Sequence, residues 1–148
     1  MAVTRQASAV WEGDLNTGTG TVSAGTSGKF EELPVSWPSR IEQPHGGRTS
    51  PEELLAAAHA SCFSMQLSSN LAKAGTPPER LEVSAEVTFD KPDGGWTVVS
   101  SALTVRGKVP GADDASFRRA AEEAKDGCPI SRALSGNVEM TVDAMLQG

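Results

Sequence analysis

The sequence predicts an α+β fold, and three observations lead to this class. A long helical segment, 51–74, has helix-start and helix-stop signals and almost no charge. Residues 81–89 and 138–146 alternate apolar and polar side chains, as half-buried strands do. A charged amphipathic helix, 113–127, and a short helix, 129–134, precede the last of these strands.

The first third of the chain predicts short strands joined by turns. Residues 2–15 have an extended pattern, and the turn sequence "NTGTG" follows them. Two further short strands are expected at 21–25 and 29–35. Residues 36–50 are rich in Pro, Gly and Ser and are predicted to form a loop. Loops of this length in compact domains are often functional.

The long helix has a recognisable start and end. Ser50 is expected as its N-cap, Pro51 as its first residue and Glu53 as the third residue of a capping box. The helix should end near Ala74, because Gly75 and a Pro-Pro pair follow.

The surface of this helix predicts a second copy of the chain. No Asp, Glu, Lys or Arg occurs in 54–72, and a helix that is apolar or small almost all round is buried on most sides. One small sheet covers only one side. Small residues such as Ala56, Ala57 and Ala60 would let another helix approach closely, so we expect a homodimer.

The middle of the chain predicts a β-hairpin. The strand 81–89 is followed by the turn sequence "KPDGG" and by a return strand with Val99, Leu103 and Val105 on one face. The helix 113–127 has acids early and Lys125 late, which suits the helix dipole.

Length and charge narrow the class of protein. A chain of 148 residues suits one domain, 1–148, with one core. The formal charge is 13 − 19 = −6, which argues against nucleic acid as a partner. No run of 18 apolar residues suggests a membrane span, and no secretory signal is recognisable at the start. We therefore expect a cytoplasmic protein.

The two cysteines, Cys62 and Cys128, have three interpretations. They are inert buried residues, or they form a transient catalytic disulfide, or they bind a metal. The metal interpretation is weak, because there is no C-x-x-C motif and the only histidines are His45 and His59. We expect no metal and no cofactor.

Local sequence alone favours Cys128 as the reactive thiol. Cys128 lies at the start of a short helix, where the dipole favours a thiolate. Cys62 lies inside the long helix and needs a cation from elsewhere, for which the preceding loop offers Arg40 and Arg48. Glu52 is either a carboxylate that holds such an arginine by a bidentate contact or simply an acid in a first helical turn.

Five segments carry a resemblance to a known family: "WEGDL", "GTGTVS", "SPEELLAAAHASCFSM", "VPGADDASF" and "AKDGCPISRAL". The sequence resembles the family of osmotically inducible protein C (OsmC) and organic hydroperoxide resistance protein (Ohr). It is more similar to the OsmC branch, because Arg40 sits just before the "SPEEL" helix. The resemblance implies an OsmC-like fold: antiparallel sheets packed on a long buried central helix, in an intertwined homodimer.

The resemblance also implies a thiol-dependent peroxidase that reduces organic hydroperoxides to alcohols, in defence against oxidative and osmotic stress. The peroxidatic cysteine of the family falls on Cys62 and the resolving cysteine on Cys128. The family's arginine and glutamate fall on Arg40 and Glu52. The local argument favours Cys128 as the attacking thiol; we follow the family. No role is implied for His59.

Substrate and reductant follow from the same resemblance. An external dithiol reopens the disulfide, and the family's electron donors include lipoylated proteins. We expect an apolar substrate pocket formed by Leu33, Val35, Trp37, Ile41 and Met65. The alternative function is a non-catalytic protein on the same fold that binds a small apolar ligand.

Overall fold

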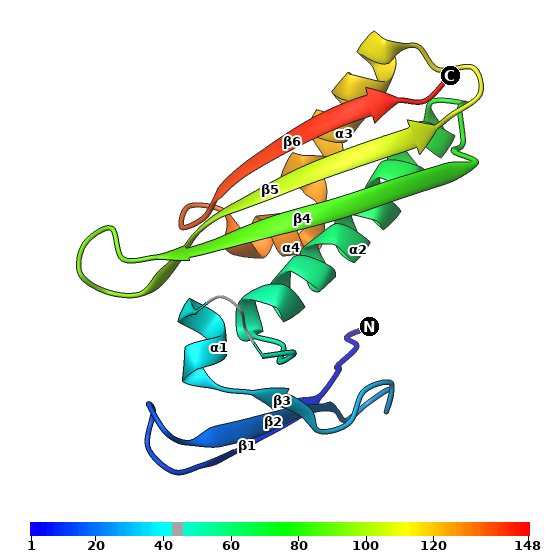
Figure 1. Ribbon diagram of the computed structural model, residues 1–148. Coiled ribbons are helices and arrows are strands. Elements are labelled where there is room, and N and C mark those ends of the chain that lie inside the picture. The colour runs from blue at the N-terminus through cyan, green and yellow to red at the C-terminus, as the bar shows by residue number, and fades with distance from the viewer. Residues whose placement is uncertain (43–45) are drawn as a thin grey trace. The chain divides into compact units, whose positions relative to one another are not determined.

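The computed structural model describes residues 1–42 and 46–148, and the chain divides into two compact units (Figure 1). The first unit is Met1–Leu54 and the second is Leu55–Gly148. His45 and part of the predicted loop lie outside the described residues.

The first unit contains a three-stranded antiparallel sheet and a short helix. The strands are β1 (Ala7–Glu12), β2 (Thr19–Ala24) and β3 (Leu33–Val35), in the order β1-β2-β3. The three predicted strands are confirmed; β1 and β3 are shorter than predicted, whereas β2 starts two residues earlier and ends one residue earlier. The helix α1 (Trp37–Ile41) follows directly after β3.

Gly20 in β2 and Gly18, just before this strand, make room for the indole of Trp11. In the register of β1 and β2, Trp11 lies opposite Gly20, and a Cβ atom at Gly20 would lie 2.7 Å from Trp11 Cε3. A Cβ at Gly18 would lie 3.0 Å from Trp11 Cζ2 and only 2.3 Å from the Asp14 carbonyl oxygen. The Trp11 Nε1–H group donates to the Gly13 carbonyl oxygen at 3.0 Å. These contacts fix the indole orientation.

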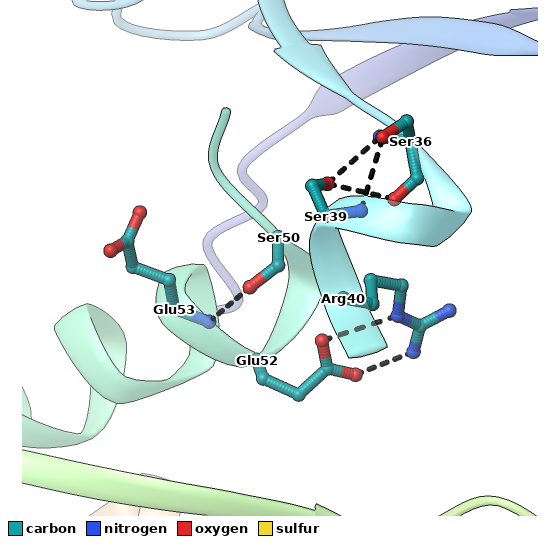
Figure 2. Close-up of polar contacts among 6 residues, drawn as sticks. All are labelled: Ser36, Ser39, Arg40, Ser50, Glu52 and Glu53. Carbon is teal, nitrogen blue, oxygen red and sulfur yellow. Dashed lines mark hydrogen bonds and ion pairs between the residues drawn. The ribbon is translucent and has the colours of Figure 1, made fainter. Parts of the chain in front are cut away.

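The prediction that 36–50 is only a loop is wrong at its start, where α1 forms. Ser36 is the N-cap, and its hydroxyl accepts from the backbone N–H of Ser39 at 3.2 Å (Figure 2). The Ser39 hydroxyl accepts in return from the backbone N–H of Ser36. Pro38 occupies a first-turn position, where its missing N–H costs nothing. Five residues give too few repeats for a helical periodicity to be visible in the sequence.

The helix α2 (Pro51–Lys73) confirms the predicted long helix. The Ser50 hydroxyl accepts from the backbone N–H of Glu53 at 3.1 Å, which is one half of the predicted capping box (Figure 2). A stripe at every fourth residue is fully or almost fully buried: His59, Phe63, Leu67 and Leu71. Met65 is 72% exposed, so coverage of the other side of this helix by a second copy of the chain remains a prediction.

The second unit contains a mixed sheet in the order β4-β5-β6. The strands are β4 (Arg80–Asp90), β5 (Thr97–Lys108) and β6 (Glu139–Leu146). The β4–β5 hairpin is confirmed as antiparallel, but β5 and β6 pair in parallel, so the expectation of purely antiparallel sheets is wrong. The helices α3 (Asp114–Gly127) and α4 (Pro129–Leu134) form the crossover that a parallel pair requires.

The hydrophobic core of the second unit joins α2, β5, α3 and β6. Its buried members are Phe63, Leu67, Leu71, Leu103, Val105, Val109, Phe117, Ala121, Ala124, Cys128 and Ala144. Phe117 packs over Gly107, where a Cβ atom would lie 2.5 Å from Phe117 Cζ. This close approach explains a glycine on the buried face of β5, next to its last residue.

The buried face of β5 contains Ser101 in addition to the predicted Leu103 and Val105, whereas the predicted Val99 is only partly buried. Leu103 and Val105 are buried as expected. Val99 falls at a register shift, because Phe89 pairs with Val98 and Thr88 with Ser100. The next buried position on this face is Ser101, which is 1% exposed. Its hydroxyl lies 2.7 Å from Nδ1 of the buried His59, which explains a serine in the core.

No helix in 1–42 or 46–148 has the length and apolar character needed to cross a membrane.

Candidate functional site

The second unit brings the two cysteines together. Cys62 lies in the middle of α2, and Cys128 lies at the junction between α3 and α4. Both thiols are free, Cys128 is fully buried and Cys62 is partly exposed. The two side chains are close enough for hydrogen bonding from Cys128 to raise the pKa of Cys62. Of this pair, Cys62 is therefore the thiol that meets solvent, with Cys128 behind it in the core.

The junction that holds Cys128 is built from local sequence signals. Cys128 has an extended backbone, with φ −67° and ψ 141°, and ends α3 while it caps α4. Pro129 starts α4, as the sequence predicts. The Cys128 sulfur takes the place of a capping oxygen and accepts from the backbone N–H of Ser131 at 3.4 Å. The sulfur atom is thus fixed against the first turn of α4.

Burial is the largest influence on the ionisation of Cys62. It raises the pKa of the Cys62 thiol, and the neighbouring Cys128 raises it further. Hydrogen bonding from the backbone of Ile130, in the first turn of α4, acts in the opposite direction and lowers the Cys62 pKa. The start of α4 thus contacts both sulfur atoms, whereas sequence reasoning assigned it to Cys128 alone. A thiolate at Cys62 needs a further source of positive charge.

The first unit holds Arg40 and Glu52 as an ion pair between α1 and the first turn of α2. Arg40 Nε donates to Glu52 Oε2 at 3.2 Å, and Arg40 Nη2 donates to Glu52 Oε1 at 2.5 Å (Figure 2). The Glu52 side chain is 10% exposed and the Arg40 side chain 28%. The Arg40 guanidinium also lies 5.4 Å from the ring centroid of Trp37. A bidentate contact of this kind fixes the orientation of the guanidinium plane.

An apolar pocket of about 360 Å³ lies beside this arginine within the first unit. Its lining includes Trp11, Leu15, Val35, Trp37, Arg40 and Pro51. Val35 and Trp37 were expected to line a pocket, whereas Leu33 and Ile41 do not line this one, and Met65 belongs to the second unit. Sequence reasoning missed Trp11 and Leu15, although both stand in the quoted motif "WEGDL".

A buried histidine is linked to Cys128 by a chain of hydrogen bonds. His59 is fully buried on α2; its Nδ1 lies 2.7 Å from Ser101 Oγ and its Nε2 lies 2.8 Å from Ser131 Oγ. Ser131 Oγ in turn lies 3.0 Å from Cys128 Sγ. Burial lowers the pKa of His59, so the imidazole is neutral at pH 7. Sequence reasoning assigned His59 no role; the only signal was a single histidine in an uncharged helix.

The part of the chain that the structure describes contains no group of three or more His, Cys, Asp or Glu side chains arranged to hold a metal ion.

The sequence is similar to that of known proteins along most of its length. The chain matches the family described as OsmC-like protein over residues 44–143. It is 41% identical over 147 residues to the peroxiredoxin OsmC of Escherichia coli (strain K12), with 99% of each chain covered. It is 30% identical over 123 residues to an organic hydroperoxide resistance protein of Xanthomonas axonopodis pv. citri (strain 306), with 79% of this chain and 81% of that protein covered.

The structure is similar to that of an organic hydroperoxide resistance protein, OsmC, from Legionella pneumophila. The TM-score is 0.71 and the sequence identity 23%, with 98% of each chain covered. This likeness confirms the α+β architecture. The full-length match at 41% identity fits the OsmC branch that the sequence motifs predict. The chain belongs to the OsmC-like protein family.

Proposed function

We propose that the protein is a thiol-dependent peroxidase that reduces organic hydroperoxides to alcohols by a two-cysteine cycle. The observation that carries this proposal is the placement of a partly exposed thiol, Cys62, against a fully buried one, Cys128. Membership of a family that includes a peroxiredoxin and organic hydroperoxide resistance proteins supports it.

In the first step the Cys62 thiolate attacks the terminal oxygen of the hydroperoxide. The O–O bond breaks, the alcohol leaves after taking up a proton, and Cys62 becomes a sulfenic acid. The partial exposure of Cys62 supports this assignment, because a peroxide can reach it, whereas Cys128 is fully buried.

In the second step Cys128 attacks the oxidised sulfur of Cys62. A disulfide forms and water leaves, which protects Cys62 from further oxidation. An external dithiol, such as that of a lipoylated protein, then restores both thiols. Such a cycle suits a compartment in which thiols are kept reduced, and we propose the cytoplasm.

Arg40 is proposed to supply the charge that Cys62 lacks. Burial raises the pKa of Cys62, so a stable thiolate needs a cation that reverses this effect. The two contacts from Glu52 hold the Arg40 guanidinium in one orientation. The pocket beside Arg40 is largely apolar, so we propose that it takes the organic part of the substrate.

The active assembly is proposed to be a homodimer. In the first unit the buried residues in 1–42 and 46–54 are Gly20, Ser36 and Glu52, so this sheet buries no large apolar side chain of its own. Val10 is 60% exposed, and Met65 on α2 is 72% exposed. A second copy would cover these surfaces.

The cycle is tested by following both sulfur atoms in reduced protein given one equivalent of cumene hydroperoxide. Wild-type protein should lose two thiols and form a Cys62–Cys128 disulfide, identified by mass spectrometry of non-reduced digests. Cys62→Ser should consume no peroxide. Cys128→Ser should consume one equivalent and leave a sulfenic acid at Cys62 that dimedone traps. Dimedone labelling of Cys128 in Cys62→Ser would show that the two roles are reversed.

The same experiment separates the alternative function. The pocket of about 360 Å³ also suits a small apolar ligand bound without chemistry. In that case the thiol count stays unchanged after peroxide, and the pocket tryptophans, Trp11 and Trp37, report ligand binding by fluorescence.

A further inference from the structure

We infer that His59 accepts the proton of the Cys128 thiol, through the hydroxyl of Ser131, when Cys128 attacks the oxidised Cys62. This inference rests on the proposed two-cysteine cycle and names the residue that serves its second step. His59 does not touch the reacting sulfur atoms in the described contacts; it is a proton-accepting residue that acts through Ser131.

The need for such a residue follows from the burial of Cys128. Only a thiolate attacks efficiently, so the Cys128 proton must leave before the disulfide forms. Cys128 is fully buried, which makes direct transfer of the proton to solvent slow. The polar side chain in contact with the Cys128 sulfur is Ser131, with Oγ at 3.0 Å. Ser131 is itself fully buried, so its hydroxyl cannot pass the proton straight to bulk water.

The proton can continue to His59, because its Nε2 lies 2.8 Å from the same Ser131 oxygen. Before transfer, the Cys128 thiol donates to Ser131 Oγ, the Ser131 hydroxyl donates to His59 Nε2, and His59 Nδ1–H donates to Ser101 Oγ. Two proton shifts, from sulfur to oxygen and from oxygen to Nε2, then give a thiolate and an imidazolium. After them, Nε2–H donates to Ser131 and the Ser131 hydroxyl donates to the thiolate.

No hydrogen bond is lost in this exchange, which makes it suitable for a buried site. Ser101 on β5 holds the Nδ1 side at 2.7 Å throughout. The backbone N–H of Ser131, 3.4 Å from the sulfur, also favours the thiolate. This accounts for a polar serine on the buried face of β5 and a histidine in the core, which packing alone does not require.

The step balances as a condensation. The electron pair of the Cys128 thiolate forms the S–S bond, the S–O bond of the Cys62 sulfenic acid breaks, and hydroxide leaves. The proton held by His59 returns through Ser131 to the reacting sulfurs, where the hydroxide that leaves the partly exposed Cys62 takes it up and becomes water, so no net proton is gained or lost. In reduction by an external dithiol, Cys128 is the leaving group, and the same chain returns a proton to it.

The titratable groups in this network are His59, Cys128 and, in contact with Cys128, Cys62. Burial lowers the pKa of His59, which favours the neutral imidazole, the form that has a free nitrogen to accept a proton. The other residues in the network, Ser101 and Ser131, carry no charge.

The test is His59→Gln, which keeps an amide able to hydrogen-bond but removes the base. Reduced protein is mixed with one equivalent of cumene hydroperoxide and quenched over time between pH 6 and 9. Sulfenic acid, trapped by dimedone, and disulfide are counted separately by intact mass. The first step should continue at close to the wild-type rate. Disulfide formation at pH 7 should slow about 100-fold, a typical loss for a general base.

The pH profile separates proton transfer from a structural role. In His59→Gln, disulfide formation should rise about tenfold per pH unit, because hydroxide then removes the thiol proton. Ser131→Ala, which breaks the chain in the middle, should behave in the same way. Ser64→Ala is the matched control: this serine also lies on α2, bonds only to the Ala60 carbonyl oxygen among the described contacts, and should leave the kinetics unchanged.

Several outcomes overturn the inference. A wild-type rate of disulfide formation in folded His59→Gln does so, and so does a slower rate with an unchanged pH profile. If His59→Gln does not fold, Ser131→Ala decides by the same criteria. If wild-type protein itself forms no Cys62–Cys128 disulfide, the proposed function fails together with the inference, whereas in the other cases the cycle stands.

Discussion

Replacement of Arg40 by alanine should harm catalysis more than stability, and the geometry of its ion pair sets both magnitudes. The change removes two contacts to Glu52, at 3.2 and 2.5 Å, and leaves a carboxylate whose side chain is only 10% exposed. An unsatisfied, largely buried polar group costs about 1–3 kcal/mol. We expect the free energy of unfolding of Arg40→Ala to fall by this amount.

Glu52→Ala should cost less, about 1 kcal/mol or below, because the remaining Arg40 is 28% exposed and can turn toward water. Removal of one hydrogen-bond donor that stabilises a developing anion typically costs about 10²–10³ in rate. If Arg40 stabilises the Cys62 thiolate, Arg40→Ala should slow the first step by this factor and raise the pKa of Cys62. Glu52→Ala should slow it less, because the guanidinium remains but is no longer oriented.

The assays are peroxide consumption in a single turnover, the pH dependence of Cys62 alkylation, and urea unfolding. Arg80→Ala is the matched control, since Arg80 pairs with Glu82 at 2.7 Å on an exposed strand surface. Such exposed pairs contribute about 0–1 kcal/mol, and this variant should keep its activity. Wild-type rates in Arg40→Ala and Glu52→Ala would refute the catalytic reasoning and leave the pair a purely structural one.

Three other predictions concern the folded chain. Light scattering should give a mass near twice 15.4 kDa at micromolar concentration; a uniform monomer would contradict the proposed dimer. Gly107→Ala should destabilise the protein by about 1–3 kcal/mol in urea unfolding, because its Cβ would meet Phe117, and an unchanged midpoint would show that the ring moves aside without cost. Burial lowers the pKa of His59 in the folded protein below its value in the unfolded chain, about 6.5. The stabilisation that the neutral ring provides is therefore complete above about pH 6.5, and it is lost as the pH falls through the pKa of the folded protein. His59→Gln should show a weaker decline, and equal slopes would contradict this.

Helices and strands could be predicted from the sequence wherever neighbouring residues, such as caps, turns or alternating apolar positions, specify them. The start of α2 follows from Ser50 and Pro51, and its end from Gly75, because these residues act on the backbone within one turn. The β4–β5 hairpin follows from strict alternation around a turn sequence. Family membership was equally predictable, because the motifs around both cysteines are contiguous stretches of sequence. The helix α1 was missed because it has five residues and is capped by two serines.

The proposed site could be predicted only in part. The sequence motifs single out Cys62, Cys128, Arg40 and Glu52. The structure places the two cysteines together at the core of one unit, and pairs Arg40 with Glu52 in the other. The lining of the pocket was predicted only where it is near Arg40 in sequence. Trp11 reaches it through the pairing of β1 with β2, which no periodicity encodes.

The sequence by itself therefore determined every helix and strand except α1, together with the family, since each of these rests on signals carried by residues close together in the chain. Local motifs also singled out the two cysteines, one at a time. Only the tertiary structure decided that β6 runs parallel to β5, and that His59 meets residues 42 and 72 positions away. The physical reason is that such contacts depend on how α2, β5 and α4 pack around a common core. Periodicity reports which face of an element is buried, but not which side chain of another element it meets there.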